Sequence, residues 1–426
     1  MRHRQTILVG VVGVLAACGG PRAAVAPVPE PAHAVRPGIE VLLSDSLSVV
    51  RHARVGLVTN QAGVDAAGVS DVDRLRAGGL ELVALYSPEH GYRGAADPGA
   101  AVPHATDSVT GLPIYSLYLQ NTAAISATLA GLDVLLVDLQ DVGARYYTYF
   151  GTTVAVMRAA VLSGKRVVVL DRPNPIGGTV QGNVLDSAYS SLVGVLPIPM
   201  RHGMTLGELA RLANAELRIG ADLTVVPVMG WSPAMDLDQT GLPFVPPSPN
   251  LRSLEALFHY PGLCLFEGTN LSVGRGTDHA FEQVGAPWMD TTKVLARLRA
   301  AHLPGVRFAG VRFRPKKPGD AKYPNTRVAG IRLTVTDRAA YDPTATAVTM
   351  MAVIRDVHPA QFKWTPGQFD RLAGNSELRQ DLAGGAAPEA AMAGWPAELQ
   401  AFALRSQAAL LYPRSARLPA SPLPRP

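Results

Sequence analysis

The N-terminal half of the chain alternates short apolar runs with stretches of helical periodicity, and this alternation limits the possible folds more than any other feature. The apolar runs are residues 55–59, 80–86, 133–138, 166–170 and 223–228. The helix-like stretches between them are residues 69–77, 122–130, 152–162 and 205–217. Strands that are apolar on both faces and alternate with helices predict an α/β fold, in which helices cover both faces of a mostly parallel sheet.

The C-terminal part follows a different pattern, because its strand-like runs alternate apolar and polar residues as antiparallel strands with one wet face do. These runs are residues 306–314 and 327–336, and helical stretches follow at residues 345–357 and 397–411. We therefore predict a second, smaller α+β domain at residues 253–412, after a first domain at residues 38–252. This body is long enough for two domains.

The first residues resemble a processing signal rather than part of a fold. Arg2 and Arg4 precede an apolar run at residues 7–16, which is too short to span a membrane permanently. The run ends in small residues before Cys18, a pattern typical of a lipobox, in which the cysteine is acylated and becomes the new N-terminus. We predict a signal peptide at residues 1–17 and lipidation of Cys18. The alternative is an ordinary secretory peptide with an incidental cysteine.

The segment that follows Cys18 predicts a tether. Residues 18–37 contain five prolines and almost no large apolar side chain, so they cannot bury enough surface to offset the entropy of ordering. The Pro-rich residues 413–426 predict a disordered tail for the same reason. We expect the protein to be lipid-anchored in the cell envelope, at the periplasmic face of a membrane or the cell surface. Membrane contact is expected through the lipid alone.

The charge and the cysteines exclude some classes of protein. The formal charge of +5 loses Arg2 and Arg4 with the signal peptide, and the remainder is too small to indicate a nucleic-acid partner. Cys264 is the only cysteine left after Cys18, so the body cannot form an internal disulfide. Its apolar neighbours predict a buried, inert thiol.

Polar residues collect where the apolar runs end, and a run near residues 195–199 is interpreted as a further strand of this kind. Because the carboxyl ends of parallel strands share one edge of a sheet, where α/β proteins bind ligands, we expect these residues to meet there. The predicted substrate-binding residues at this edge are Asn60, Arg93, Asp138, Arg145, Tyr147, Asp171, Arg172, Asn174, Arg201 and His202.

Glu89 is the sharpest candidate for catalysis. Pro88 before it and Gly91 after the next residue indicate a stiff loop, and a carboxyl held beside a cleft suits a general acid because desolvation favours its protonated form. His90 is either catalytic or packs the Glu89 loop. Asp141 is a second candidate, although Asp138 or Asp141 can instead pair with Arg145 or cap the following helix.

Two later segments offer further polar residues. Asn250 lies beside two prolines in a segment that is either a rigid turn or a ligand contact, and residues 267–277 place Glu267, Asn270 and Arg275 among three glycines. A Gly-rich turn of this kind is a weak signal by itself. Glu208 follows Thr205 with the spacing of a capping box, so we predict that Glu208 caps a helix.

Several reaction classes lack their motifs. There is no H-E-x-x-H and no C-x-x-C for zinc, no G-x-S-x-G of a serine hydrolase, and no G-x-G-x-x-G after the first strand. We therefore expect no metal and no cofactor. The remaining carboxylates, amides, arginines and tyrosines fit glycoside hydrolysis or binding of a charged sugar.

Six segments together closely resemble the exo-β-N-acetylmuramidase family of the NamZ type. They are residues 87–94, 138–149, 171–178, 201–210, 246–250 and 267–277, in the family's order within a match from about 38 to 412. The resemblance implies a Rossmann-like N-terminal domain, a smaller C-terminal domain and an active site in the cleft between them. It also implies release of N-acetylmuramic acid from the non-reducing end of peptidoglycan fragments, with Glu89 as the catalytic acid.

The hypothesis for the reaction is that Glu89, with His90 beside it, protonates the leaving oxygen while Asp141 or Glu267 acts as nucleophile or base on the other face. One arginine is expected to bind the lactyl carboxylate of muramic acid; the candidates are Arg93, Arg172, Arg201 and Arg275. The alternatives are a lipoprotein that binds muropeptides without cleaving them and a hydrolase for another acidic sugar.

Overall fold

The computed structural model describes residues 34–414, which belong to one compact unit. The predicted signal peptide, Cys18, the tether up to residue 33 and the tail from residue 415 lie outside the described residues. Residues 34–37, which were assigned to the tether, pack on the body: Arg36 and Met229 exchange backbone hydrogen bonds of 2.9 and 3.0 Å. Arg414 likewise donates to the Gly203 carbonyl at 2.7 Å. The folded body therefore extends past both predicted bounds.

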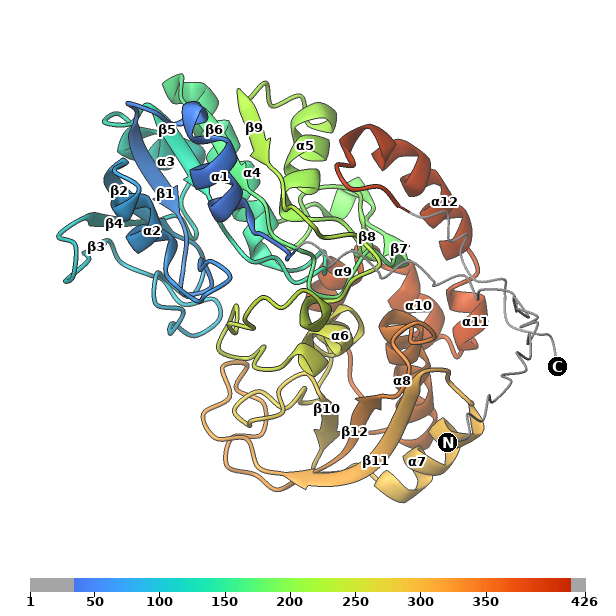
Figure 1. The fold of residues 1–426 in the computed structure, drawn as a ribbon. Coiled ribbons are helices and arrows are strands. Elements are labelled where there is room, and N and C mark those ends of the chain that lie inside the picture. Colours follow the sequence, from blue (N-terminus) through green and yellow to red (C-terminus); the bar gives the residue numbers. More distant parts are fainter. Residues whose placement is uncertain (1–33, 415–426) are drawn as a thin grey trace, which may run out of the picture. The chain divides into compact units, whose positions relative to one another are not determined.

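A seven-stranded sheet lies at the centre of the N-terminal half (Figure 1). Its strands, in spatial order, are β3 (Ala105–Thr106), β4 (Pro113–Ser116), β2 (Glu81–Ser87), β1 (Arg54–Val58), β5 (Val134–Val137), β6 (Arg166–Leu170) and β9 (Leu223–Val226). All neighbours are parallel except β3 with β4. The six parallel strands, counted along the chain, lie in the order 3-2-1-4-5-6 of Rossmann-like sheets, so the predicted fold class is confirmed.

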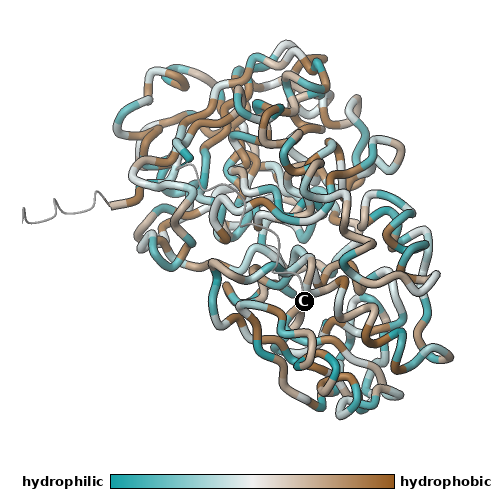
Figure 2. Tube along the Cα trace, turned by 90° about the vertical axis from the view of Figure 1, so that its right-hand side faces the viewer, coloured by the Kyte–Doolittle hydropathy of each residue, from teal (hydrophilic) through white to brown (hydrophobic). Residues whose placement is uncertain are grey.

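Helices cover both faces of this sheet, as the apolar runs predicted. Along β5, Val134 and Leu136 pack in one core, and Leu135 and Val137 pack in the other. The first core contains the helices α1 (Gly38–Asp45) and α2 (Asp71–Ala77), and the second contains α3 (Thr122–Thr128), α4 (Thr148–Ser163) and α5 (Leu206–Glu216). Figure 2 shows apolar, brown stretches of chain gathered in the upper part of the molecule. Burial of alternate side chains in two cores explains why these runs contain so few polar residues.

The expected strand near residues 195–199 is not part of the large sheet. The strand β8 (Pro199–Arg201) begins later and pairs antiparallel with β7 (Gln181–Val184) in a separate two-stranded sheet. Pro197 and Pro199 have no N–H to donate, which excludes them from the middle of a parallel sheet. The polar residues that follow β8 therefore do not follow a strand of the large sheet.

The C-terminal half contains a three-stranded antiparallel sheet in the order β10 (Gln283–Ala286), β12 (Val328–Val335) and β11 (Val306–Phe313). This smaller α+β region confirms the second part of the predicted fold class. Its helices are α6 (Leu254–Leu263), α7 (Thr291–Ala300), α8 (Pro343–Val357), α9 (Pro366–Ala373), α10 (Glu377–Ala383), α11 (Pro388–Ala391) and α12 (Trp395–Ser406). The last helix returns to pack against β7. Among residues 34–414, no helix has the length and apolar character needed to cross a bilayer.

Candidate active site

The sheet changes the direction of its strand order between β1 and β5, and residues that follow these two strands begin the candidate site. In open α/β sheets, ligands bind outside the carboxyl ends of strands at such a switch point. Asn60 follows β1, and its side-chain amide donates to the Tyr149 hydroxyl at 2.6 Å. Tyr149 lies in the first turn of α4, after β5. This hydrogen bond at the switch point thus joins two residues that are 89 positions apart in the chain.

Glu89 lies in the loop after β2, and its carboxyl group is held by two donors. One oxygen accepts the Gly99 N–H at 2.9 Å, and the other accepts the Thr148 hydroxyl at 2.7 Å. The residue is only 8% exposed, so its carboxyl does not face bulk water. Because a hydroxyl can accept as well as donate, Thr148 can serve Glu89 in both of its protonation states. This is the environment that a side chain needs to deliver a proton and then receive one.

His90 packs the Glu89 loop, which was one of the two alternatives for it. Its Nδ1 lies 2.8 Å from the Ala96 carbonyl oxygen within the same loop. Its backbone has a φ of 73°, a left-handed conformation that non-glycine residues adopt only at a cost. The side chain is buried. We therefore assign His90 to fixing the shape of the loop rather than to the chemistry.

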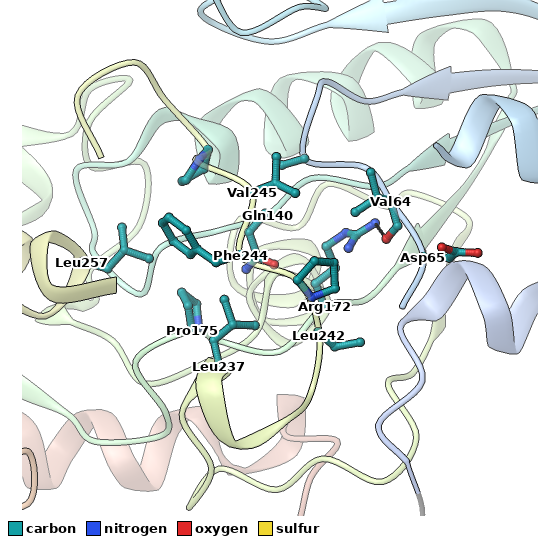
Figure 3. A pocket seen from close by; sticks show the side chains of 13 residues that line it. Val64, Asp65, Gln140, Arg172, Pro175, Leu237, Leu242, Phe244, Val245 and Leu257 are labelled. Atoms are coloured by element: carbon teal, nitrogen blue, oxygen red, sulfur yellow. Dashed lines mark hydrogen bonds between the residues drawn. The ribbon is translucent and has the colours of Figure 1, made fainter. Parts of the chain in front are cut away.

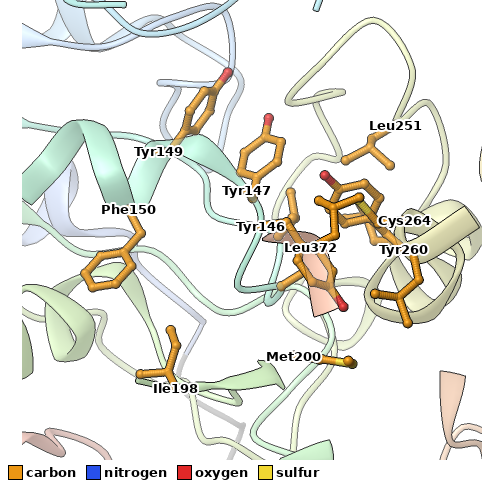
Figure 4. Packing of buried hydrophobic residues seen from close by; sticks show 14 of the residues in the cluster. Tyr146, Tyr147, Tyr149, Phe150, Ile198, Met200, Leu251, Tyr260, Cys264 and Leu372 are labelled. Carbon is orange, nitrogen blue, oxygen red and sulfur yellow. The ribbon is translucent and has the colours of Figure 1, made fainter. Parts of the chain in front are cut away.

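Tyrosines connect the Glu89 region to the C-terminal half (Figure 4). The rings of Tyr147 and Tyr149 lie 4.5 Å apart, and both hydroxyls donate to the Pro247 carbonyl, at 2.9 and 2.8 Å. The ring of Tyr260 in α6 lies 6.3 Å from that of Tyr147. Burial raises the pKa of all three phenols, so they remain neutral. Tyr147, predicted to contact the sugar, instead holds the segment around Pro247.

Asp141 forms a buried pair with His202. One Asp141 oxygen accepts the Gly143 N–H at 2.7 Å and lies 3.2 Å from His202 Nε2. His202 Nδ1 accepts the Met204 N–H, which assigns the proton of the neutral ring to Nε2, facing Asp141. The second Asp141 oxygen is buried and has no hydrogen-bond partner within residues 34–414. Asp141 therefore keeps one free, oriented acceptor.

Asp138 pairs with Arg172 rather than with Arg145, and sequence reasoning missed the third member of this group, Asp71 in α2. Arg172 Nε donates to Asp138, and its Nη2 lies 3.5 Å from Asp71. Burial raises the pKa of Asp71 well above its usual range, and the neighbouring Asp138 adds to this effect. Two buried carboxyl groups thus share one guanidinium, and this group lies at the switch point.

A small hollow lies beside Arg172 (Figure 3). Most of its lining is apolar and comes from several separate segments; it includes Val64, Pro175, Leu237, Leu242, Phe244 and Leu257. Pro247, which accepts the two tyrosine hydroxyls, also lines it. Neither Glu89 nor Glu267 contributes to its wall. The hollow is therefore next to the candidate site without containing its carboxyl groups.

Two predicted substrate-binding arginines clamp the backbone instead. The guanidinium of Arg145 donates to four carbonyls, those of Asn183, Ile198, Leu372 and Ala373. Arg201 donates to the Gln181 side chain and the Ile176 carbonyl. Both arginines are buried, and burial lowers the pKa of each to about 10. The Nη groups of both arginines bind other parts of the protein, whereas each Nε is buried without a hydrogen-bond partner among residues 34–414. We assign both arginines to holding loops together.

Asp171 and Asn174 have similar internal partners. The Asp171 carboxyl accepts from the Thr205 hydroxyl, the Gly207 N–H and the Tyr412 hydroxyl, and burial raises its pKa to about 7. The Asn174 amide donates to the Met204 carbonyl. Glu208 forms the predicted capping box with Thr205 at the start of α5. These contacts fix the segment that carries His202 towards Asp141.

The C-terminal half contributes a second carboxyl, Glu267, in the 3-10 helix η4 (Cys264–Gly268). Nε of Arg275 forms an ion pair with Glu267, and its guanidinium carbon lies 4.9 Å from the centre of the Phe281 ring. Burial lowers the pKa of Arg275, but the Glu267 carboxylate outweighs burial and raises it. Nη1 and Nη2 of Arg275 make no hydrogen bond with any described residue. Cys264 beside this pair is buried, as predicted.

Three further predicted substrate-binding residues, Arg93, Asn250 and Asn270, lie outside the hydrogen bonds around Glu89. The Arg93 side chain is 67% exposed and donates to Asp107 at 3.0 Å. Asn270 bonds the backbone of Gln361 and Lys363. Asn250 is half-buried, and its side-chain amide makes no hydrogen bond with the described residues. None of these three is drawn into the contacts around Glu89.

Sequence reasoning also missed Thr148 and Tyr118 next to Glu89. Burial and the Glu89 carboxylate raise the pKa of Tyr118 to about 12, so its phenol stays neutral. Thr148 lies inside the segment 138–149 that was singled out, and its place at the start of a helix after a strand was the available signal. In the described part of the chain, no three His, Cys, Asp or Glu side chains gather as a metal site.

Comparisons with known proteins give a consistent result over the whole body. Two family models match in succession: exo-β-N-acetylmuramidase NamZ, N-terminal, over residues 55–255, and its C-terminal counterpart over residues 258–412. The peptidoglycan β-N-acetylmuramidase NamZ of Bacillus subtilis (strain 168) is 42% identical over 381 residues, which cover 89% of this chain and 91% of that protein.

Solved structures agree with this result. A crystal structure of a DUF1343 family protein from Bacteroides fragilis is similar with a TM-score of 0.82 and 33% identity, over 90% of this chain and 100% of the other. A second DUF1343 family protein from the same organism has a TM-score of 0.71 and 31% identity, over 89% and 99% of the two chains.

Proposed function

Because the chain belongs to the exo-β-N-acetylmuramidase NamZ family, we propose that it is a glycosidase that releases terminal N-acetylmuramic acid from peptidoglycan fragments, with Glu89 as its catalytic acid. The family predicted from six motifs is thereby confirmed. The observation that carries the assignment of Glu89 is its burial between the Thr148 hydroxyl and the Gly99 N–H, at the carboxyl edge of the sheet.

Glu89 has the properties of a proton donor for a glycosidic oxygen. The residue is buried, and the two groups that hold its carboxyl are neutral and impose no fixed charge on it. After the proton has left, the same N–H and hydroxyl stabilise the carboxylate. A glycosidase needs this reversible behaviour from one of its two carboxyl groups.

Asp141 is the second carboxyl in our proposal, as nucleophile or base. Its free oxygen is buried while the other is fixed by Gly143 and His202, so the free lone pairs keep one orientation. Glu267, the other candidate, already has an oxygen committed to Arg275. A carboxylate in such an ion pair is a weaker nucleophile, because the guanidinium stabilises its charge.

Arg275 is our candidate for binding the lactyl carboxylate that distinguishes muramic acid from glucosamine. Glu267 binds the Nε of Arg275, and the Phe281 ring packs against its guanidinium. The two Nη groups remain available for a carboxylate. A guanidinium fixed in this way loses little entropy when it binds. Arg172 and Arg201 have most donors committed, and Arg93 is exposed. Arg275→Lys should raise KM for muramic acid glycosides more than it lowers kcat.

We propose further that the enzyme is lipid-anchored in the cell envelope through Cys18. This rests on the small residues before Cys18 and the apolar run at residues 7–16, together with a substrate that lies in the envelope. Cys18→Ser in the full chain should move the protein from the membrane fraction to the soluble fraction. A mutant that stays in the membrane fraction would overturn the anchor.

A chromogenic glycoside of N-acetylmuramic acid tests the activity directly. We expect the purified body, from residue 34 onward, to release the chromophore from this glycoside and not from the matched N-acetylglucosamine glycoside. Tight binding of the first compound without release would indicate a receptor instead of an enzyme. Equal release from both would indicate that the lactyl carboxylate is not recognised.

A further inference from the structure

The connection between β11 and β12, residues 314–327, concentrates positive charge. It contains five basic residues and a single acidic one, Asp320, in a chain whose formal net charge is only +5. The basic residues are Arg314, Lys316, Lys317, Lys322 and Arg327. We refer to residues 314–327 as the basic connection. Its local excess of charge nearly equals that of the whole protein.

Most of these charges have no counter-ion. Arg314, Lys316, Lys317 and Arg327 are exposed, and none forms an ion pair with a carboxylate of residues 34–414. By contrast, the half-buried Arg36 and the exposed Arg252 each pair with an aspartate. Like charges held close together repel each other, and no carboxylate of residues 34–414 forms an ion pair with these four side chains. An external anion would relieve it.

The basic connection reaches from Glu267 to the Glu89 loop. The Lys316 N–H donates to the Gly276 carbonyl at 2.8 Å, next to Arg275, and Lys322 donates to the Glu267 carbonyl at 3.0 Å. In the middle of the basic connection, Gly319 approaches the Glu89 loop, since a Cβ atom on Gly319 would lie 3.4 Å from Cδ of Pro98. Pro98 precedes Gly99, the backbone donor to Glu89. The exposed charges therefore border the proposed site.

The backbone of the basic connection is held in a costly shape. Lys317, Ala321, Tyr323 and Asn325 all have positive φ, and each such non-glycine residue needs contacts elsewhere to maintain it. The Tyr323 hydroxyl donates to the Asn270 carbonyl at 2.7 Å, and Lys322 donates to three carbonyls. Gly276 allows the close approach, since a Cβ there would lie 2.6 Å from the Lys316 oxygen. The backbone that carries the exposed charges is thus fixed, while the lysine side chains extend from it.

We propose that the basic connection binds carboxylates of the glycan beyond the terminal sugar, those of the next muramic acid and of its peptide. This inference rests on the proposed function. Muramic acid recurs along peptidoglycan, so a longer substrate carries regularly spaced negative charge. Flexible lysines suit anions whose position varies with the peptide, and a patch of one sign also speeds the encounter of oppositely charged partners at low salt.

The test compares the double variant Lys316→Gln/Lys317→Gln with the unmodified body on two substrates. One is the chromogenic muramic acid glycoside, and the other is a glycan that begins with muramic acid and contains two more. At low salt we expect kcat/KM on the glycan to fall about tenfold, against about twofold on the glycoside, and the gap to shrink at about 0.5 M salt, where screening is strong. The control Arg51→Gln/Lys165→Gln removes two charges at the opposite edge of the sheet and should change neither rate.

The results on the two substrates distinguish a failure of this inference from a failure of the proposed function. An equal loss on both substrates, or no loss on either, would overturn the basic connection as a glycan site while the proposed function stands. An unmodified body that is inactive on the glycoside would overturn the proposed function itself. If the variant keeps its glycan rate but no longer binds vesicles of anionic phospholipid, the surface serves the membrane and the inference is wrong.

Discussion

Glu89 and Glu267 come from opposite halves of the chain, and the protein holds them in different ways. The partners of Glu89 are a hydroxyl and a backbone N–H. The partners of Glu267 are the guanidinium of Arg275 and the distant thiol of Cys264. Both side chains are largely buried, so burial alone does not distinguish them.

The different partners of Glu89 and Glu267 suit the two carboxyl groups to different roles. The donors to Glu89 are neutral, so no fixed charge lies against its carboxyl. The Glu267 carboxylate instead neutralises a buried guanidinium, which would lose its partner without it. We therefore assign the proton transfer to Glu89 and the orientation of Arg275 to Glu267. The same residue type serves chemistry in one half of the molecule and substrate positioning in the other.

The largest expected effect comes from removing the acid. Glu89→Gln keeps the size of the side chain and can keep both hydrogen bonds, but it cannot deliver a proton. We expect kcat on a disaccharide of muramic acid and glucosamine, whose poor leaving group needs the proton, to fall by about 100-fold or more, the usual contribution of general acid catalysis. Thermal unfolding should be close to that of the unmodified protein. A near-normal kcat would remove Glu89 from this role.

Asp171, like Glu89, accepts hydrogen bonds from neutral donors, but it is completely buried. Its pKa is raised from an ordinary value near 4 to about 7 because burial disfavours its charge. A carboxyl whose pKa is raised in the folded state contributes stability below about pH 4 and loses that contribution as the pH rises through about 7. The loss between these limits is on the order of 4 kcal/mol.

Asp171→Asn should remove this pH dependence, since Thr205 and Tyr412 can accept hydrogen bonds from an amide. The measurement is the free energy of unfolding by urea at several pH values. The difference between the two proteins should change steadily from pH 4 to pH 7 in favour of the variant. A constant difference over this range would contradict the raised pKa.

Glu267→Gln should chiefly affect stability. It leaves the Arg275 guanidinium mostly buried without its anion, and we expect the free energy of unfolding to fall by about 2 kcal/mol, somewhat less than for a fully buried pair. Glu89→Gln, which removes no ion pair, is the matched comparison in the same urea titration. If Glu89→Gln is the more destabilising of the two, the contrast between the carboxyls is wrong.

The smallest expected effect comes from the hydroxyl next to Glu89. Thr148→Val keeps the shape of the side chain and removes one hydrogen bond to the carboxyl, so we expect kcat to fall about fivefold, equivalent to a bond worth about 1 kcal/mol. Thr153→Val, one turn further along α4, removes a hydroxyl that bonds only the Tyr149 carbonyl. That control should keep its kcat. Equal losses in both variants would indicate a general effect on α4.

Much of the fold followed from local patterns. The runs at residues 166–170 and 205–217 predicted β6 and α5 almost to the residue, because an apolar run flanked by polar caps fixes both the element and its ends. The short β4 and β7 were missed and β8 begins later than predicted, since strands of three or four residues contain too few side chains to show a period.

The sequence by itself determined the sheet, the family and the candidate acid, since these depend on the order and spacing of residues along the chain. Only the tertiary structure decided which polar residues are free to act. Arg145 and Arg275 are both arginines in conspicuous segments, yet one is consumed by carbonyls from residues as distant as Ala373 and the other keeps two free donors. The reason is physical: the fate of a buried donor depends on partners that folding brings from far along the chain.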